Sequence, residues 1–144
     1  MSAGAQRGRF LGRPLDLVTA AEAQAHCAAW IAGPRNAHVV MTVNAATLVT
    51  MRRDARLAAA CENADLVVAD GAAVVWAARL ARVAVPARVT GIDLMTALLR
   101  QAHENAWRVY LLGAQAATLA RMVERLGREL PGVELAGARD GYFA

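Results

Sequence analysis

One short apolar run constrains the fold of this chain more than any other stretch. Leu66-Val-Val-Ala69 stands between Asp65 and the dipeptide Asp70-Gly71. An apolar run of this length, with helical patterns on both sides, is typical of a strand buried on both faces of a parallel sheet. Asp70 then follows the end of the strand, and Gly71 relaxes the backbone for the turn into the next helix. The stretch therefore predicts a parallel α/β fold with a carboxylate at a strand end.

Strand and helix patterns alternate along the rest of the chain. The predicted strands cover residues 38–43, 66–69, 107–112 and 133–136, and predicted helices cover residues 20–32, 45–52, 55–62, 71–82 and 115–130. Residues 88–94 are predicted to form a loop that leads into a further helix, whose buried apolar stripe contains Ile92, Met95, Leu98, Leu99 and Ala102. We expect residues 1–13 to be a flexible basic segment with one short strand around Phe10 and Leu11. Residues 14–144 should form a single α/β domain. Its expected architecture is a three-layer, mostly parallel, Rossmann-like sheet with helices on both faces.

Composition limits where the protein works and what it binds. The chain has 144 residues, enough for one domain, and its net charge of +4 comes from arginine alone, because it has no lysine. Arginine suits phosphate contacts, which favours phosphorylated substrates or an anionic membrane surface, whereas the scattered arginines and few aromatics do not favour nucleic acid. No apolar run could span a membrane or act as a signal peptide, so we expect a cytoplasmic protein. Cys27 and Cys61 should be buried thiols.

Polar and glycine residues follow several predicted strands. Thr42 and Asn44 lie at the end of the first, Asp70 and Gly71 follow the second, and Gly113 follows the third. Because the carboxyl ends of parallel strands share one edge, we expect a ligand crevice there, with helix N–H groups near Gly113 open to a phosphate.

Several nucleotide-binding and catalytic patterns are absent from the sequence. Neither G-x-G-x-x-G nor a Walker motif is present, and the only serine is Ser2, which disfavours a serine nucleophile. The histidines are far apart, and there is no Asp-x-Asp or Cys-x-x-Cys, so we expect no metal site and no cofactor.

Five short motifs together resemble a known family. They are Thr42-Val-Asn44, Ala69-Asp70-Gly71, Arg88-Val-x-Gly91-x-Asp93-Leu94, Leu111-Leu112-Gly113 and Asp140-Gly-Tyr-Phe143. In their order and separations they resemble the WecG/TagA/CpsF glycosyltransferases, and the resemblance runs from about Phe10 to the last residue. Each motif alone is weak, but five in register over about a hundred residues are specific.

The resemblance implies an inverting enzyme of bacterial cell-surface polysaccharide biosynthesis. It would move a sugar such as N-acetylmannosamine from a UDP-sugar to a polyprenyl-diphosphate-linked acceptor, without an obligatory metal, at the cytoplasmic face of the inner membrane. By this resemblance Asp70 is the general base, and Thr42 lines the same catalytic pocket. The implied substrate-binding residues are Asn44, Gly71, Arg88, Gly91, Asp93 and Gly113.

Each residue also has a simpler interpretation. Asp70 could be a turn residue that caps the following helix, Thr42 an ordinary strand residue and Asn44 a helix cap. Asp93 is more simply a first-turn helix acid than a ligand. Arg88, a basic residue before a glycine turn, is the most specific of the set as a phosphate contact.

Two departures from the family pattern modify these expectations. The family usually has a second glycine where Ala114 stands, and it continues beyond the Gly-Tyr-Phe motif with a Pro-x-Gln-Glu signature and a membrane-associating tail. We therefore expect an incomplete catalytic unit with weak or no transferase activity, which self-associates through apolar surface near Phe143. Two alternatives stay open: an exopolysaccharide glucosyltransferase of the same family, and a non-catalytic module that binds nucleotide-sugars.

Overall fold

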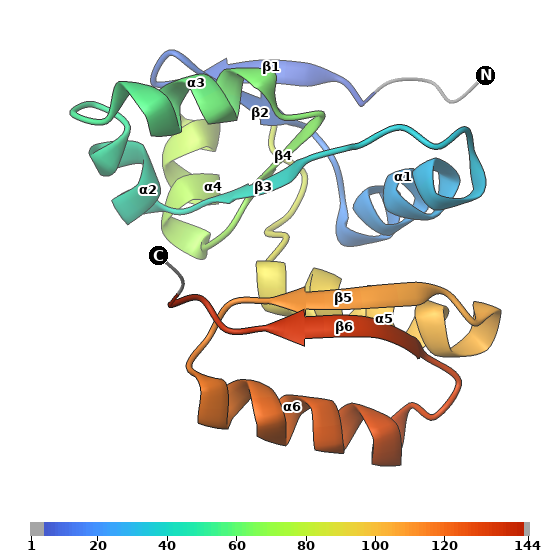
Figure 1. Cartoon of the computed structure of the whole chain (residues 1–144). Coiled ribbons are helices and arrows are strands. Elements are labelled where there is room, and N and C mark those ends of the chain that lie inside the picture. The colour runs from blue at the N-terminus through green and yellow to red at the C-terminus, as the bar shows by residue number, and fades with distance from the viewer. Residues whose placement is uncertain (1–4, 143–144) are drawn as a thin grey trace. The chain divides into compact units, whose positions relative to one another are not determined.

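The computed structural model describes residues 5–142 and divides the chain into two compact units, with the boundary between Leu94 and Met95 (Figure 1). The first unit contains β1 (Arg7–Phe10), β2 (Arg13–Asp16), α1 (Ala20–Ala32), β3 (Val40–Val43), α2 (Ala45–Thr50), α3 (Ala55–Asn63), β4 (Leu66–Ala69) and α4 (Ala72–Leu80). Helix α5 (Gly91–Asn105) begins in the first unit and continues into the second, which also contains β5 (Arg108–Leu112), α6 (Ala116–Glu129) and β6 (Glu134–Arg139).

The apolar run at residues 66–69 is the central strand of the first unit. Strand β4 is buried along its whole length and pairs in parallel with β3, where Thr42 lies opposite Val68. The core around β4 includes Val43, Met51 and Leu15, all nearly inaccessible to solvent. The prediction of a buried parallel strand is confirmed.

Helix ends follow the local sequence signals closely. Thr19 caps α1, because its hydroxyl accepts the Glu22 N–H and the Glu22 carboxylate accepts the Thr19 N–H. The Thr19 N–H and the Thr19 hydroxyl both donate to the Glu22 carboxylate and lower its pKa from the ordinary value. The helix ends at Gly33, as its sequence predicts.

The N-terminal segment contains a feature that the sequence analysis missed. Strands β1 and β2 form an antiparallel hairpin, whose turn contains Leu11 and Gly12 at positive φ. The expected single strand around Phe10 and Leu11 is therefore wrong in detail, since Leu11 lies in the turn. Strands of four residues, one with a proline, carry too short an alternation to be recognised in the sequence.

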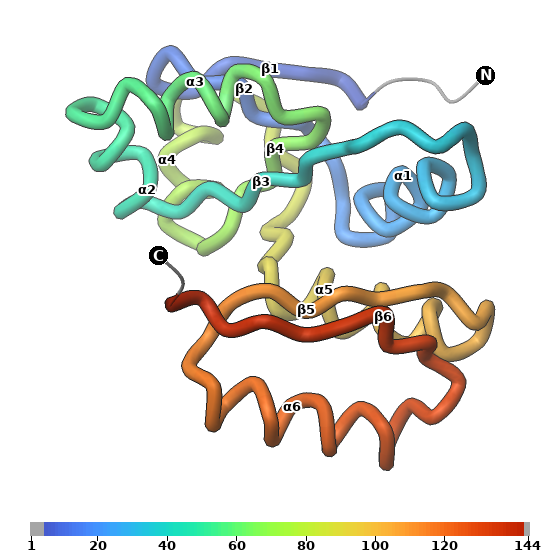
Figure 2. Tube along the Cα trace, viewed as in Figure 1, coloured from blue at the N-terminus to red at the C-terminus, as the bar shows by residue number. Residues whose placement is uncertain are grey.

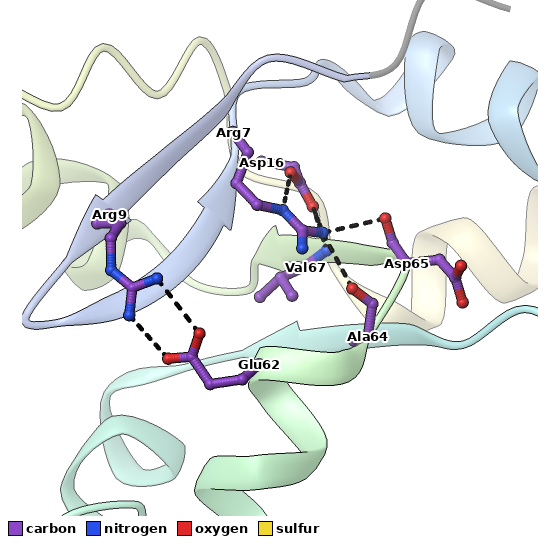
Figure 3. Close-up of polar contacts among 7 residues, drawn as sticks. All are labelled: Arg7, Arg9, Asp16, Glu62, Ala64, Asp65 and Val67. Carbon is purple, nitrogen blue, oxygen red and sulfur yellow. Dashed lines mark hydrogen bonds and ion pairs between the residues drawn. The ribbon is translucent and has the colours of Figure 1, made fainter.

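An ion pair with a buried carboxylate attaches this hairpin to β4 (Figure 3). The Arg7 guanidinium donates two hydrogen bonds of 2.8 Å to the Asp16 carboxylate, which is buried, and Asp16 accepts the Val67 N–H at 2.6 Å. Arg7 also donates to the carbonyl oxygens of Ala64 and Asp65, both at 3.0 Å. The hydrogen bond to Asp16 raises the pKa of Arg7. Each oxygen of the carboxylate thus has a donor, as a buried charge requires.

The second unit contains another parallel strand pair. The Cα trace runs from β5 through α6 and back into β6, which pairs with β5 (Figure 2). Leu111 of β5 packs with Leu119 and Leu126 of α6 in a small core. The apolar stripe predicted for α5 is only partly buried, because Ala102 is inaccessible whereas Ile92 is 74% exposed.

The α/β class and the parallel pairing are confirmed. Within residues 5–142 the strands form three two-stranded sheets, β1–β2, β3–β4 and β5–β6. The three-layer Rossmann-like arrangement stays a prediction.

Candidate functional site

Asp70 occupies the first position after β4, at the carboxyl end of the parallel pair. Its N–H donates to the Val43 carbonyl at 2.9 Å, which continues the ladder by one residue, and the residue is half-buried. Gly71 follows with φ +115°, a backbone conformation that L-residues rarely adopt, and α4 begins immediately after it. The chain therefore turns sharply behind Asp70.

The segment before α5 returns to this strand end. The Val89 N–H donates to the Ala69 carbonyl at 2.8 Å, and the Gly91 N–H donates to Asp70 Oδ2 at 3.4 Å. The carboxylate is thus hydrogen-bonded to the first residue of α5 rather than to the first turn of α4. That contact disfavours the interpretation of Asp70 as the cap of α4.

Thr42 lies against the same glycine. A Cβ built on Gly91 would stand 3.2 Å from Thr42 Cγ2, 3.6 Å from Thr42 Oγ1 and 3.9 Å from Asp70 Oδ2. Any side chain at residue 91 would therefore press on Thr42, and glycine leaves this space open. The structure brings together three of the residues that the sequence singled out: Thr42, Asp70 and Gly91.

Asn44 and Asp93 have the simpler roles that the sequence left open. The Asn44 side-chain oxygen accepts the Thr47 N–H at 2.9 Å and so caps α2. Asp93 is an exposed acid in the first turn of α5, where its N–H donates to Thr90 Oγ1 at 3.1 Å. Neither observation tests a contact with substrate.

Sequence reasoning missed Thr90. Its hydroxyl caps the helix that begins at Gly91, the residue whose N–H reaches Asp70. The signal was present, because Thr90-Gly-Ile-Asp93 fits the Ser/Thr-x-x-acid pattern that marks helix starts.

Arg88 belongs to the same unit as Asp70, whereas Gly113 belongs to the other unit. The Arg88 side chain is exposed, two residues before Thr90 on the segment that returns to Asp70. Gly113 belongs to the second unit, at φ +123°, and its N–H donates to the Arg139 carbonyl at 2.9 Å. The grouping of Gly113 with Asp70 stays a prediction. Phe143 of the last motif lies outside the described residues.

Two further features of residues 5–142 bear on metals and membranes. No group of three or more His, Cys, Asp or Glu side chains in this range is arranged to hold a metal ion. No helix in the same range is long and apolar enough to cross a membrane.

Comparison with known proteins adds a family match. The model of the family described as "Glycosyl transferase WecG/TagA/CpsF family" matches residues 8–144. A protein of Bacillus spizizenii named N-acetylglucosaminyldiphosphoundecaprenol N-acetyl-beta-D-mannosaminyltransferase is 34% identical over 103 residues, and one of the same name from Bacillus subtilis is 28% identical over 104 residues. Each alignment covers 72% of this chain, which spans 40% and 41% of the length of these relatives.

Proposed function

This chain belongs to the WecG/TagA/CpsF family of glycosyltransferases, and from that premise we propose that it transfers N-acetylmannosamine from a UDP-sugar, with inversion, to a polyprenyl-diphosphate-linked N-acetylglucosamine. The two relatives are named for this sugar transfer to a diphosphoundecaprenol-linked acceptor. The observation that carries the proposal is the cluster of Thr42, Asp70 and Gly91 at the carboxyl ends of β3 and β4. Ligands of open α/β sheets bind at this edge.

The proposed reaction needs one base. Asp70 takes the proton of the acceptor hydroxyl as its oxygen attacks the anomeric carbon of the donor. The bond from that carbon to the UDP oxygen breaks, and UDP leaves with the bonding electron pair. Attack from the face opposite UDP inverts the anomeric centre, and a single carboxylate is enough for this displacement.

Neighbouring groups support this role for Asp70. The Gly91 N–H holds one carboxylate oxygen in place, and the other is left to meet the acceptor hydroxyl. Thr42 Oγ1 and Asp70 Oδ2 both lie within 4 Å of the position that a Gly91 Cβ would take, and the proposal assigns the Thr42 hydroxyl to orienting the acceptor. Arg88, exposed on the adjacent segment, is assigned by this proposal to the diphosphate of the donor.

The proposal includes a place of action. A lipid-linked acceptor is confined to the membrane, so the enzyme must work at the membrane surface. The arginine-derived net charge of +4 suits peripheral contact with anionic lipids on the cytoplasmic face. Self-association through exposed apolar surface also belongs to this proposal.

The test is transfer of N-acetylmannosamine from its UDP form to a short-chain lipid-diphosphate N-acetylglucosamine, without added metal. Slow transfer by the unmodified protein is sufficient for this test, because the rate of each variant is divided by the rate of the unmodified protein. We expect Asp70→Asn to lower the rate by roughly 10²–10⁴-fold, the usual contribution of a general base. Its melting temperature should change little, since an amide can still accept the Gly91 N–H.

Asp65→Asn is the matched control, because Asp65 lies at the opposite end of the same strand. It should keep transfer within a few-fold of the unmodified protein. Equal rates for Asp70→Asn and Asp65→Asn would refute the assignment of the base. UDP binding without transfer by the unmodified protein would instead favour a nucleotide-sugar-binding module.

A further inference from the structure

An apolar groove opens in the first unit between α2, α4 and the hairpin turn. It has a volume of about 200 Å³ and is lined by Leu48, Val49 and Arg52 from the α2 side, Ala73 and Ala77 from α4, and Leu11 from the turn, among others. Leu11 is 74% exposed and Val49 62% exposed. Large apolar side chains left in water around a groove indicate a binding surface.

The position of the groove connects it with the candidate catalytic site. Helix α2 begins directly after Asn44, at the end of β3, and α4 begins directly after Gly71, at the end of β4. Both walls of the groove therefore start at the sheet edge where Asp70 stands. Ala45 and Ala73, at the first turns of the two helices, line the end of the groove that is nearest to this edge.

The lining chemistry indicates the class of ligand. Among the described residues that line the groove, Arg52 is the only charged one, and none is acidic. Arg52 follows the C-terminal end of α2, so it lies at the end of the groove remote from the sheet edge, and the lining between is apolar. A channel of this kind complements the hydrocarbon chain of a ligand whose polar head is held at the sheet edge.

We propose that this groove binds the isoprenoid chain next to the diphosphate of the lipid-linked acceptor. The inference rests on the proposed function, because it takes the acceptor to be a sugar joined through a diphosphate to a polyprenol. With the sugar hydroxyl at Asp70, the diphosphate and then the first isoprene units extend away from the sheet edge. The channel between α2 and α4 leads away from the same edge and offers those units an apolar path.

The experiment measures binding of isoprenyl diphosphates to the 144-residue chain by titration calorimetry. The probes are farnesyl diphosphate, isopentenyl diphosphate and inorganic diphosphate, each below any micelle-forming concentration. They share the diphosphate and differ in hydrocarbon length. We expect farnesyl diphosphate to bind at least about tenfold more tightly than isopentenyl diphosphate, because its longer chain buries more methylene groups.

Two adjacent substitutions on α2 locate the binding surface. Val49→Glu places a carboxylate in the groove, whereas Thr50→Glu adds the same charge at an exposed neighbour that is not among the lining residues. We expect Val49→Glu to abolish the preference for the longer chain and Thr50→Glu to retain it. Equal affinity for all three probes, or equal loss in both variants, would overturn the proposal.

UDP binding separates this inference from the proposed function. Both variants should bind UDP as tightly as the unmodified protein does, because the groove is proposed to contact only the isoprenoid chain of the acceptor and not the donor. If the unmodified protein binds no UDP yet prefers the longer isoprenoid, the proposed function fails while the groove assignment stands. If it binds UDP but shows no chain-length preference, the groove assignment alone fails.

Discussion

At the residue scale, Ala114 carries backbone strain that its neighbour avoids. Gly113 adopts φ +123° and Ala114 adopts φ +62°, both in the region that favours glycine. A Cβ in the left-handed conformation costs roughly 1–2 kcal/mol, because it approaches the following carbonyl oxygen. The turn is nevertheless held by a hydrogen bond of 2.9 Å from the Gly141 N–H to the Ala114 carbonyl. The resemblance to the family implied a glycine at this position, and the backbone explains that preference.

Ala114→Gly should therefore stabilise the protein. We expect the free energy of unfolding to rise by up to about 1 kcal/mol, the relief of strain less the greater freedom of glycine in the unfolded chain. Ala120→Gly is the control, since Ala120 lies in the interior of α6 at an exposed position, where glycine costs roughly 1 kcal/mol. Urea denaturation of both variants gives the comparison. A loss of stability in Ala114→Gly as large as that in Ala120→Gly would contradict the inference that the backbone of Ala114 is strained.

The candidate site was predictable in part from single residues. Asp70 and Gly71 were found because an apolar run ended at them, and Gly71 does need its positive φ. The contact of Gly91 with Thr42 and Asp70 was not predictable from local sequence, because residues 42, 70 and 91 meet only through tertiary folding. The predicted strand ends supplied Thr42 and Asp70, whereas Gly91 came from the family resemblance alone.

At the scale of elements, the β1–β2 hairpin is held to the core by charge as well as by apolar burial. Arg7 and Arg9 lie two residues apart on β1 and both pair with an acid at 2.8 Å, but their partners differ in burial. The side chain of Asp16 is 1% exposed, whereas that of Glu62 is 36% exposed. One strand therefore carries two ion pairs of the same type, one with a buried acid and one with an exposed acid.

Replacing each arginine with alanine should separate the two versions. Arg7→Ala leaves the Asp16 carboxylate buried without its cation, and we expect a loss of about 2–4 kcal/mol of unfolding free energy, since the guanidinium itself is partly exposed. Arg9→Ala should cost at most about 1 kcal/mol, as exposed pairs do. Denaturant titration measures both. Similar losses of unfolding free energy in the two variants would show that other groups stabilise the Asp16 carboxylate when Arg7 is removed.

Helices and strands were predicted correctly where the local sequence contains a clear start or stop signal. Helix α1 has a capping box and a Gly33 stop, and its predicted bounds match the observed ones. The prediction missed the hairpin because one of its anchors, the hydrogen bond from the Val67 N–H to the Asp16 carboxylate, joins residues 51 apart in the chain. Local periodicity carries no information about such a contact.

At the scale of the whole molecule, the two units differ in the size of their cores. The core of the first unit extends from Phe10 to Val85 and includes side chains from both strands of the parallel pair. Among the described residues of the second unit, the clustered buried core includes Leu111, Leu119 and Leu126, with partly buried neighbours such as Leu99 and Val109, and Ala102 is buried as well. Because apolar burial is the main favourable term in folding, the first unit should be the more stable one.

Hydrogen exchange tests this difference directly. We expect the amides of β5 and β6 to exchange through openings of lower free energy than those of β3 and β4, although both are parallel pairs with ladder hydrogen bonds. The matched comparison is between Val68, buried in β4, and Leu111, buried in β5, because both lie within a paired strand. Leu126→Ala removes part of the smaller core, so it should speed exchange in β5 and α6 and leave β4 unchanged. Equal protection of Val68 and Leu111, with both responding to Leu126→Ala, would show that residues 5–142 open as one cooperative unit and that core size does not divide the molecule.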